Sequence, residues 1–143
     1  MLTVEEYLSQ HGAGHESELT DELRANAQMT VDKANQLLQA FGEDRGQRSG
    51  WRPQSVNDAM PNAAYHSWHI TCQAIDLDDD DKRLQEWCAA DKGANLIPLG
   101  LYMENPIATP SWCHVQIVPP HSGQRVYFPN AAWARRALEQ GLA

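Results

Sequence analysis

The sequence has few basic residues and no long apolar run. Lysines and arginines number 11 against 19 aspartates and glutamates, which gives a formal net charge of −8. No basic stripe interleaved with aromatic residues occurs, so we expect no nucleic-acid partner. No stretch approaches the roughly 18 apolar residues that a helix needs to cross a bilayer, so we expect no membrane span.

A secretory signal and a disulfide framework are also missing. The first residues, MLTVEEYLSQHG, have neither a cationic start nor an apolar core. We therefore expect synthesis in the cytoplasm without a signal peptide. The cysteines Cys72, Cys88 and Cys113 form an odd set without CxxC spacing, which is typical of reduced thiols.

The chain length suits one domain. A core of this size buries roughly 70% of the unfolded surface, so no metal is needed merely to hold it. Thr3 followed by Glu6 predicts a capped short helix, and we interpret residues 1–18 as an N-terminal arm. Apolar residues recurring at intervals of three and four over residues 20–41, with Gly42 as a stop, predict the principal helix.

The rest of the chain predicts short helices and strands. Helices are expected from Pro53 until a break at 61–64, around residues 84–88, and from an Asn130 cap to Gly141. Strands are expected at 70–77, 96–103, 112–118 and 125–128, with the last two antiparallel through the PPHSGQ turn. This order predicts a single α+β domain over residues 1–143, with a small antiparallel sheet and helices packed on one face.

Two histidines and one aspartate form a candidate metal site. His69, Asp76 and His114 would leave a divalent ion with an open fourth position, where a water becomes acidic enough to be a nucleophile. Because 70–77 has strand character, we expect His69 in the preceding loop and His114 on a neighbouring strand. Residue types alone also fit hydrogen-bonded or surface side chains, and the same set occurs in non-haem Fe(II) oxygenases.

Four motifs that occur in a fixed order make the prediction of a metal site more specific. They are SGWRPQSVN at 49–57, SWHITCQAID at 67–76, LGLYME at 99–104 and PSWCHVQ at 110–116. Their order and spacing resemble the zinc D-Ala-D-Ala metallopeptidases, which share a fold with the hedgehog signalling domain. The resemblance covers about residues 30–129 and implies a hedgehog-like or DD-peptidase-like α+β fold.

The resemblance also implies an activity. It implies Zn²⁺ held by His69, Asp76 and His114, and hydrolysis of peptidoglycan stem-peptide or cross-link bonds involving D-amino acids. The reaction would be of the D-Ala-D-Ala carboxypeptidase or L-Ala-D-Glu endopeptidase type. Many small relatives are similar to phage endolysins or virion-associated wall hydrolases, so we expect a monomer that acts on the cell wall after release or as part of a virion.

Further site residues follow from the same resemblance. It places Arg52 opposite the substrate carboxylate or the developing oxyanion, and it places Ser67, Tyr102 and Trp112 around the substrate. From the residues alone, Arg52 also fits a surface cation, and Trp112 also fits core or rim packing.

The chain departs from the pattern of these peptidases at two places. Cys72 replaces a glycine between two of the expected ligands, where a thiol could crowd the site or compete for the metal, and we expect a packed small side chain there. Ser111 and Trp112 occupy the positions where relatives carry an acid or a second histidine as the proton acceptor.

Peptide hydrolysis needs another group to take that proton. Glu104 is the best substitute, followed by His121 and Asp58. A noncatalytic zinc-containing binding or virion structural module of the same fold is the alternative function.

Overall fold

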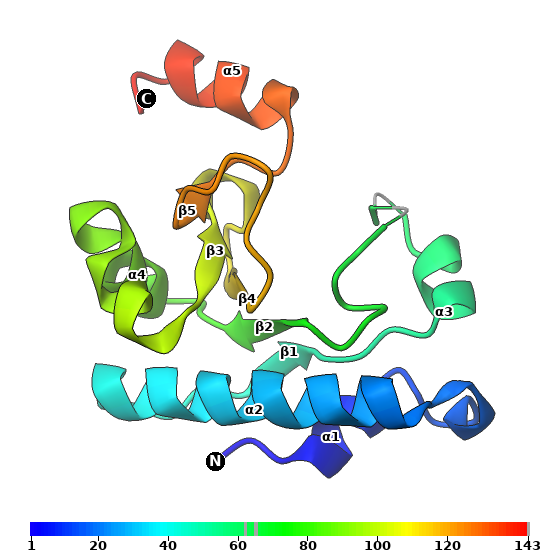
Figure 1. Cartoon of the computed structure of the whole chain (residues 1–143). Coiled ribbons are helices and arrows are strands. Elements are labelled where there is room, and N and C mark those ends of the chain that lie inside the picture. The colour runs from blue at the N-terminus through cyan, green and yellow to red at the C-terminus, as the bar shows by residue number, and fades with distance from the viewer. Residues whose placement is uncertain (62, 65, 143) are drawn as a thin grey trace.

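The structure, a computed structural model, describes residues 1–61, 63–64 and 66–142 (Figure 1). The described helices are α1 (Val4–Ser9), α2 (Asp21–Phe41), α3 (Gln54–Ala59), α4 (Arg83–Gly93) and α5 (Ala131–Glu139), with 3₁₀ helices η1 (Glu16–Glu18), η2 (Ala94–Leu99) and η3 (Pro106–Ala108). The strands are β1 (Gln47–Ser49), β2 (Ala74–Asp78), β3 (Tyr102–Glu104), β4 (Trp112–Gln116) and β5 (Val126–Tyr127). The predicted α+β class is confirmed. The break expected at 61–64 includes Asn62, which lies outside the described residues.

The helix starts and stops follow the predicted capping residues. The Thr3 hydroxyl accepts a hydrogen bond from the Glu6 amide at 3.2 Å, and the Thr20 hydroxyl accepts one from the Leu23 amide at 3.1 Å. Gly42 ends α2 with a φ of 95°, a left-handed conformation that glycine adopts without strain. None of the described helices is long and apolar enough to cross a membrane.

The sheet is mixed rather than antiparallel. Its strand order is β1-β2-β4-β3-β5, and β3 pairs with β5 in parallel while the other neighbours are antiparallel. The predicted hairpin between 112–118 and 125–128 is therefore wrong, because β5 pairs with β3 instead of β4. Pro119 and Pro120 follow β4 and have no amide hydrogen to donate, so the chain leaves the ladder there.

Several predicted strand bounds also need correction. Only the end of the segment 96–103 is strand, because η2 occupies residues 94–99 and Gly100 reverses the chain with a φ of 67°. The segment 70–77 becomes strand only at Ala74. β1 lies between the principal helix and Pro53, where the sequence analysis predicts no strand, and Pro53 precedes α3 instead of being its first residue.

The sheet has one apolar face and one polar face. Ile75, Leu77, Met103 and Val115 are at most 1% exposed and belong to the core with α2 and α4. Alternate residues of the same strands point the other way. The register pairs Ser49 with Asp76, Asp76 with His114, and Glu104 with Tyr127. A row of polar side chains thus crosses the sheet from β1 to β5.

The helices do not all lie on one face as predicted. α4 contacts β3, β4 and β5 and covers the apolar face, whereas α3 lies across the sheet from α4 (Figure 1). α2 lies beside β1 and β2, and α5 lies beyond β5 at the other end of the strand order (Figure 1). The polar face is therefore bordered by α3, α5 and their flanking loops.

The N-terminal arm packs into the domain. The Tyr7 side chain is fully buried, and its hydroxyl donates to the Ala74 carbonyl at 2.7 Å. The Trp51 amide donates to the Tyr7 carbonyl at 3.0 Å. At Gly50 a Cβ would lie 2.5 Å from that same carbonyl, so this close approach requires glycine. Residues 1–18 therefore support the segment that carries Arg52.

Candidate metal centre

His69, Asp76 and His114 come together at the polar face. Their nitrogen and oxygen ligand atoms all lie within 4.8 Å of one another, and all three residues are buried. His69 Nε2 lies 3.3 Å from Asp76 Oδ2, and His114 Nδ1 lies 2.8 Å from Asp76 Oδ1. The predicted convergence of the three residues is confirmed, and the group could hold a metal ion.

Local backbone structure explains how the three residues meet. Asp76 and His114 are directly paired across β2 and β4, so their side chains leave the same face. His69 lies in the turn before β2, as the sequence predicts. The Arg52 amide donates to the His69 carbonyl at 3.2 Å, and Cys72 turns the chain toward the strand with a φ of 60°.

The ring orientation of His69 leaves a lone pair free for a ligand. Its Nδ1–H donates to the Gly50 carbonyl at 2.9 Å. The neutral imidazole then carries its lone pair on Nε2. Nε2 is buried, and although it lies 3.3 Å from Asp76 Oδ2, it makes no hydrogen bond of good geometry among the described residues. A metal ion would give this atom the partner that it lacks.

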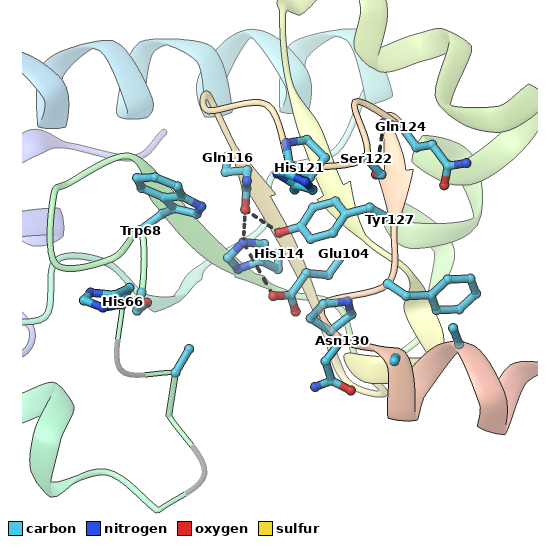
Figure 2. A pocket seen from close by; sticks show the side chains of 17 residues that line it. His66, Trp68, Glu104, His114, Gln116, His121, Ser122, Gln124, Tyr127 and Asn130 are labelled. Atoms are coloured by element: carbon cyan, nitrogen blue, oxygen red, sulfur yellow. Dashed lines mark hydrogen bonds and ion pairs between the residues drawn. The ribbon is translucent and has the colours of Figure 1, made fainter.

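His114 is oriented by Gln116. The Gln116 amide nitrogen donates to the Val118 carbonyl at 2.8 Å, so its Oε1 faces His114 and accepts from Nε2–H, also at 2.8 Å. The Tyr127 hydroxyl donates to the same Oε1 at 2.5 Å, and Figure 2 shows both residues beside the His114 ring. His114 Nδ1 therefore faces Asp76 Oδ1 at 2.8 Å, donates to that carboxylate when the ring is protonated, and offers a lone pair to a metal only after the proton leaves. Such outer partners fix the tautomer and orientation of metal-binding histidines.

The charges around the group favour a proton on His114 when no ion is bound. Burial lowers the pKa of His114, but the Glu104 and Asp76 carboxylates outweigh it and raise the pKa to about 9. Burial raises the pKa of Asp76, yet His69 and His114 hold it well below its usual range. Asp76 is thus ionised, and a metal ion would have to displace the His114 proton.

Arg52 and Glu104 border the same group. Both line a cavity of about 840 Å³ that also contains the three candidate ligands. Arg52 Nη1 lies 3.4 Å from Asn57 Oδ1, while its buried Nε has no hydrogen-bond partner among the described residues. Burial lowers the pKa of Arg52, and the Asp76 and Glu104 carboxylates oppose that shift. Glu104 Oε1 lies 4.0 Å from His114 Nε2. The structure brings both predicted residues to the site.

The predicted substrate-binding residues divide into two groups. Ser67 and Trp112 line the cavity, and the Ser67 hydroxyl accepts from the His69 amide at 3.2 Å. Tyr102 is not among the described residues that line the site cavities. Its ring lies under the Arg125 guanidinium, 4.2 Å from ring centroid to Cζ. Tyr102 pairs with Gln116 across β3 and β4 and packs against Arg125.

The remaining candidates lie farther from the three ligands. Asp58 is exposed on α3, where it accepts from Gln54 at 2.7 Å, and it does not line the site cavities. His121 lines a second cavity beyond His114. The Cys72 thiol is buried in the core, which raises its pKa to about 12. The expectation of a packed small side chain at Cys72 is confirmed.

Three residues of the site have no counterpart in the sequence prediction. His11 comes from the N-terminal arm, outside the motifs, and lines the cavity with Arg52. Burial and the charges of Arg52 and His69 lower the pKa of His11. Gln116 stands two residues after His114 on β4, so strand alternation was a signal that could have found it. Tyr127 reaches the site only through the parallel pairing of β5 with β3, which no local pattern reveals.

Comparison with known proteins does not identify a family for this chain. No protein-family model, no curated protein and no solved structure matches the chain. The functional argument therefore depends on the His69, Asp76 and His114 group and on its surroundings.

Proposed function

We propose that this chain is a zinc-dependent peptidoglycan peptidase that hydrolyses stem-peptide or cross-link bonds involving D-amino acids. The observation that carries the proposal is the fixed orientation of the two histidines. Because the Gly50 carbonyl and Gln116 accept from His69 Nδ1 and His114 Nε2, the other nitrogens, His69 Nε2 and His114 Nδ1, face the Asp76 carboxylate, and both can bind a metal once the proton on His114 Nδ1 is released. Two imidazoles and one carboxylate suit zinc better than magnesium or calcium, which prefer all-oxygen sites.

The order of the four sequence motifs supports the substrate class. They resemble zinc D-Ala-D-Ala metallopeptidases, and the three residues that the resemblance names as ligands are those that meet at the sheet. We therefore place the action of the protein, as a monomer, on the cell wall after release or within a virion.

Zinc bound at this group would supply a Lewis acid that polarises the scissile carbonyl and makes water more acidic. Glu104 takes the proton from the attacking water and returns it to the leaving nitrogen, because it is the carboxylate beside His114 that faces the cavity. Arg52 binds a substrate carboxylate through the guanidinium that lines the cavity.

A noncatalytic zinc-binding module is the second candidate. The Ser111 hydroxyl, at a position where relatives carry the proton acceptor, accepts from Arg48 Nη1 at 2.5 Å. Trp112, at the other such position, lies 5.8 Å from the Arg48 guanidinium, measured from Cζ to the ring centroid. Neither residue takes the role of the missing acid, so the catalytic assignment depends on Glu104.

A muropeptide digest combined with metal analysis tests the function. We expect one zinc per chain and cleavage that a chelator abolishes, measured by mass spectrometry of the products. His114→Ala should lose both zinc and activity. His15→Ala is the matched control, because His15 pairs with Glu18 at the surface. Stoichiometric zinc without cleavage would favour the binding module, and full zinc binding by His114→Ala would show that the site is wrong.

A further inference from the structure

Two cavities meet at the candidate metal centre. The first, of about 840 Å³, extends from the three ligands toward His11 and Arg52. The second, of about 570 Å³, extends from His114 toward Trp68 and Tyr127. His114 and Glu104 line both cavities. Each volume lies within the range of roughly 300–1,000 Å³ that small-molecule pockets occupy. The reactive centre therefore has room for substrate on both sides.

The two cavities differ in charge. Arg52 gives the first cavity a guanidinium that is only partly engaged, with Asn57 Oδ1 at 3.4 Å and an unpartnered Nε in the described structure. Arg48, which lines the same cavity, is already paired with Asp78 at 3.1 Å and Asp80 at 3.2 Å. Arg52 is therefore the cation available to a substrate carboxylate.

The second cavity is aromatic and nearly uncharged. Of the described residues that line it, Glu104 is the single aspartate, glutamate, lysine or arginine, and it lies at the junction with the first cavity. Trp68 is 40% exposed, and Tyr127 and Phe128 also contribute aromatic rings. Apolar walls with a few polar groups suit the neutral part of a peptide.

We propose that the enzyme is an endopeptidase that binds an internal segment of a peptide across both cavities. This inference rests on the proposed peptidase function. The residue with a free carboxylate lies in the Arg52 cavity, and the neutral part of the chain lies in the aromatic cavity. At the junction, the water oxygen bonds to the carbonyl carbon and the C–N bond breaks. The new amine leaves with the proton that Glu104 returns, and the other product is a carboxylate.

A pair of N-acetylated stem pentapeptides tests the inference, one with a free C-terminus and one with a C-terminal amide. Both contain L-Ala, D-Glu, diaminopimelate and two D-Ala, so both keep their side-chain carboxylates. The zinc-loaded protein should cut both peptides at the same internal bond, with kcat/KM within about threefold, as read from product masses. Release of the terminal D-Ala from the free peptide alone would overturn the endopeptidase assignment and leave the peptidase function standing. Failure of the zinc-bound protein to cut both these peptides and the muropeptide digest would refute the function itself.

A matched pair of variants on α5 tests use of the second cavity. Ala134 lines that cavity, whereas Ala132 is exposed on the same helix and lines neither cavity. Ala134→Trp should lower kcat/KM for both pentapeptides by at least about tenfold with zinc content unchanged, because the indole occupies substrate space. Ala132→Trp should retain parental values. Equal activity of the two variants would show that substrate does not enter the second cavity.

Discussion

The two faces of the sheet are formed by the same strands, but one buries apolar side chains and the other buries polar and charged ones. Ile75 and Leu77 on β2 point into a core that excludes water, and each is fully buried. Asp76 lies between them and points to the other face, where it meets His69 and His114. Burying apolar side chains stabilises the fold, whereas burying a carboxylate costs free energy unless it is paired.

The arrangement of the polar side chains thus depends on hydrogen bonds and ionic contacts between them rather than on apolar packing. Gly50 and Gln116 hold the two imidazoles, and the imidazoles hold Asp76 in its ionised form. Even so, His69 Nε2 makes no hydrogen bond of good geometry within the described residues. The polar face therefore contains a buried group that could hold a metal ion, whereas the apolar face contributes to the stability of the fold.

The largest expected effects come from substitutions at two adjacent residues, Ile75 on the apolar face and Asp76 on the polar face. Ile75→Ala should lower the free energy of unfolding of the metal-free protein by about 2–5 kcal/mol, because it leaves a cavity in the core. Its zinc affinity should stay close to the parental value. Asp76→Asn should abolish stoichiometric zinc binding because the anionic ligand is lost. Urea unfolding in chelator and zinc titration measure the two outcomes. Zinc binding by Asp76→Asn at parental affinity would contradict the division between the faces.

Gln116 tests whether the partners of the histidines on the polar face contribute to zinc binding, because Gln116 is not itself one of the expected ligands. Gln116→Ala should weaken zinc binding by about 10–100-fold, since His114 loses the acceptor that fixes its tautomer. The measurement is competition with a chelating dye, and nitrogen NMR of His114 should report a mixture of tautomers. Tyr127→Phe is the milder variant, because it removes one donor from Gln116 Oε1 and leaves the contact with His114. A zinc affinity of Gln116→Ala within threefold of the parent would remove Gln116 from the site.

Substitution of Arg52 tests whether the polar face binds a substrate carboxylate, separately from metal binding. Arg52→Lys keeps the positive charge but loses the planar fork of donors, so kcat/KM should fall by roughly tenfold to a hundredfold with zinc content unchanged. Amidation of the D-Glu carboxylate in the substrate should slow cleavage by the parental protein and hardly affect cleavage by the variant. Equal cleavage of free and amidated peptides by the parent would show that Arg52 does not bind a carboxylate there.

The sequence predicted the parts of the molecule that local patterns encode. Thr3, Thr20 and Gly42 mark helix ends because capping involves residues within one turn. The convergence of Asp76 and His114 followed from motif order and strand character. The parallel pairing of β5 and the 3₁₀ helix η2 were missed, because strand pairing is a long-range choice and β-forming residues also occur in tight turns.

The same limit applies to the site residues. His11 and Tyr127 are brought to the site by packing of the chain ends, which no local spacing expresses. Tyr102 was expected at the substrate because it belongs to the LGLYME motif. Its contact with Arg125 joins residues 23 positions apart, which the motif does not contain, and the place of Tyr102 at the substrate stays a prediction.

The last effect concerns pH, and it has opposite signs in the stability of the metal-free protein and in zinc binding. The pKa of His114 is raised to about 9 in the folded metal-free state, against about 6.5 when unfolded. Its contribution to stability is therefore fully present below about pH 6.5 and is lost as the pH rises through about 9. Urea unfolding in chelator should show the metal-free protein becoming less stable over that window.

Zinc binding should show the reverse trend, because the ion must displace the His114 proton. Between pH 7 and 8 the apparent affinity should rise roughly tenfold, the slope of one released proton. Calorimetry in two buffers with different ionisation enthalpies counts that proton directly. His15→Ala should leave the count unchanged, because His15 lies at the surface beside Glu18. A zinc affinity that is flat over this range would show that His114 is already neutral before the metal binds. In that case the Asp76 and Glu104 carboxylates would not hold a proton on His114, and this electrostatic difference between the two faces would be absent.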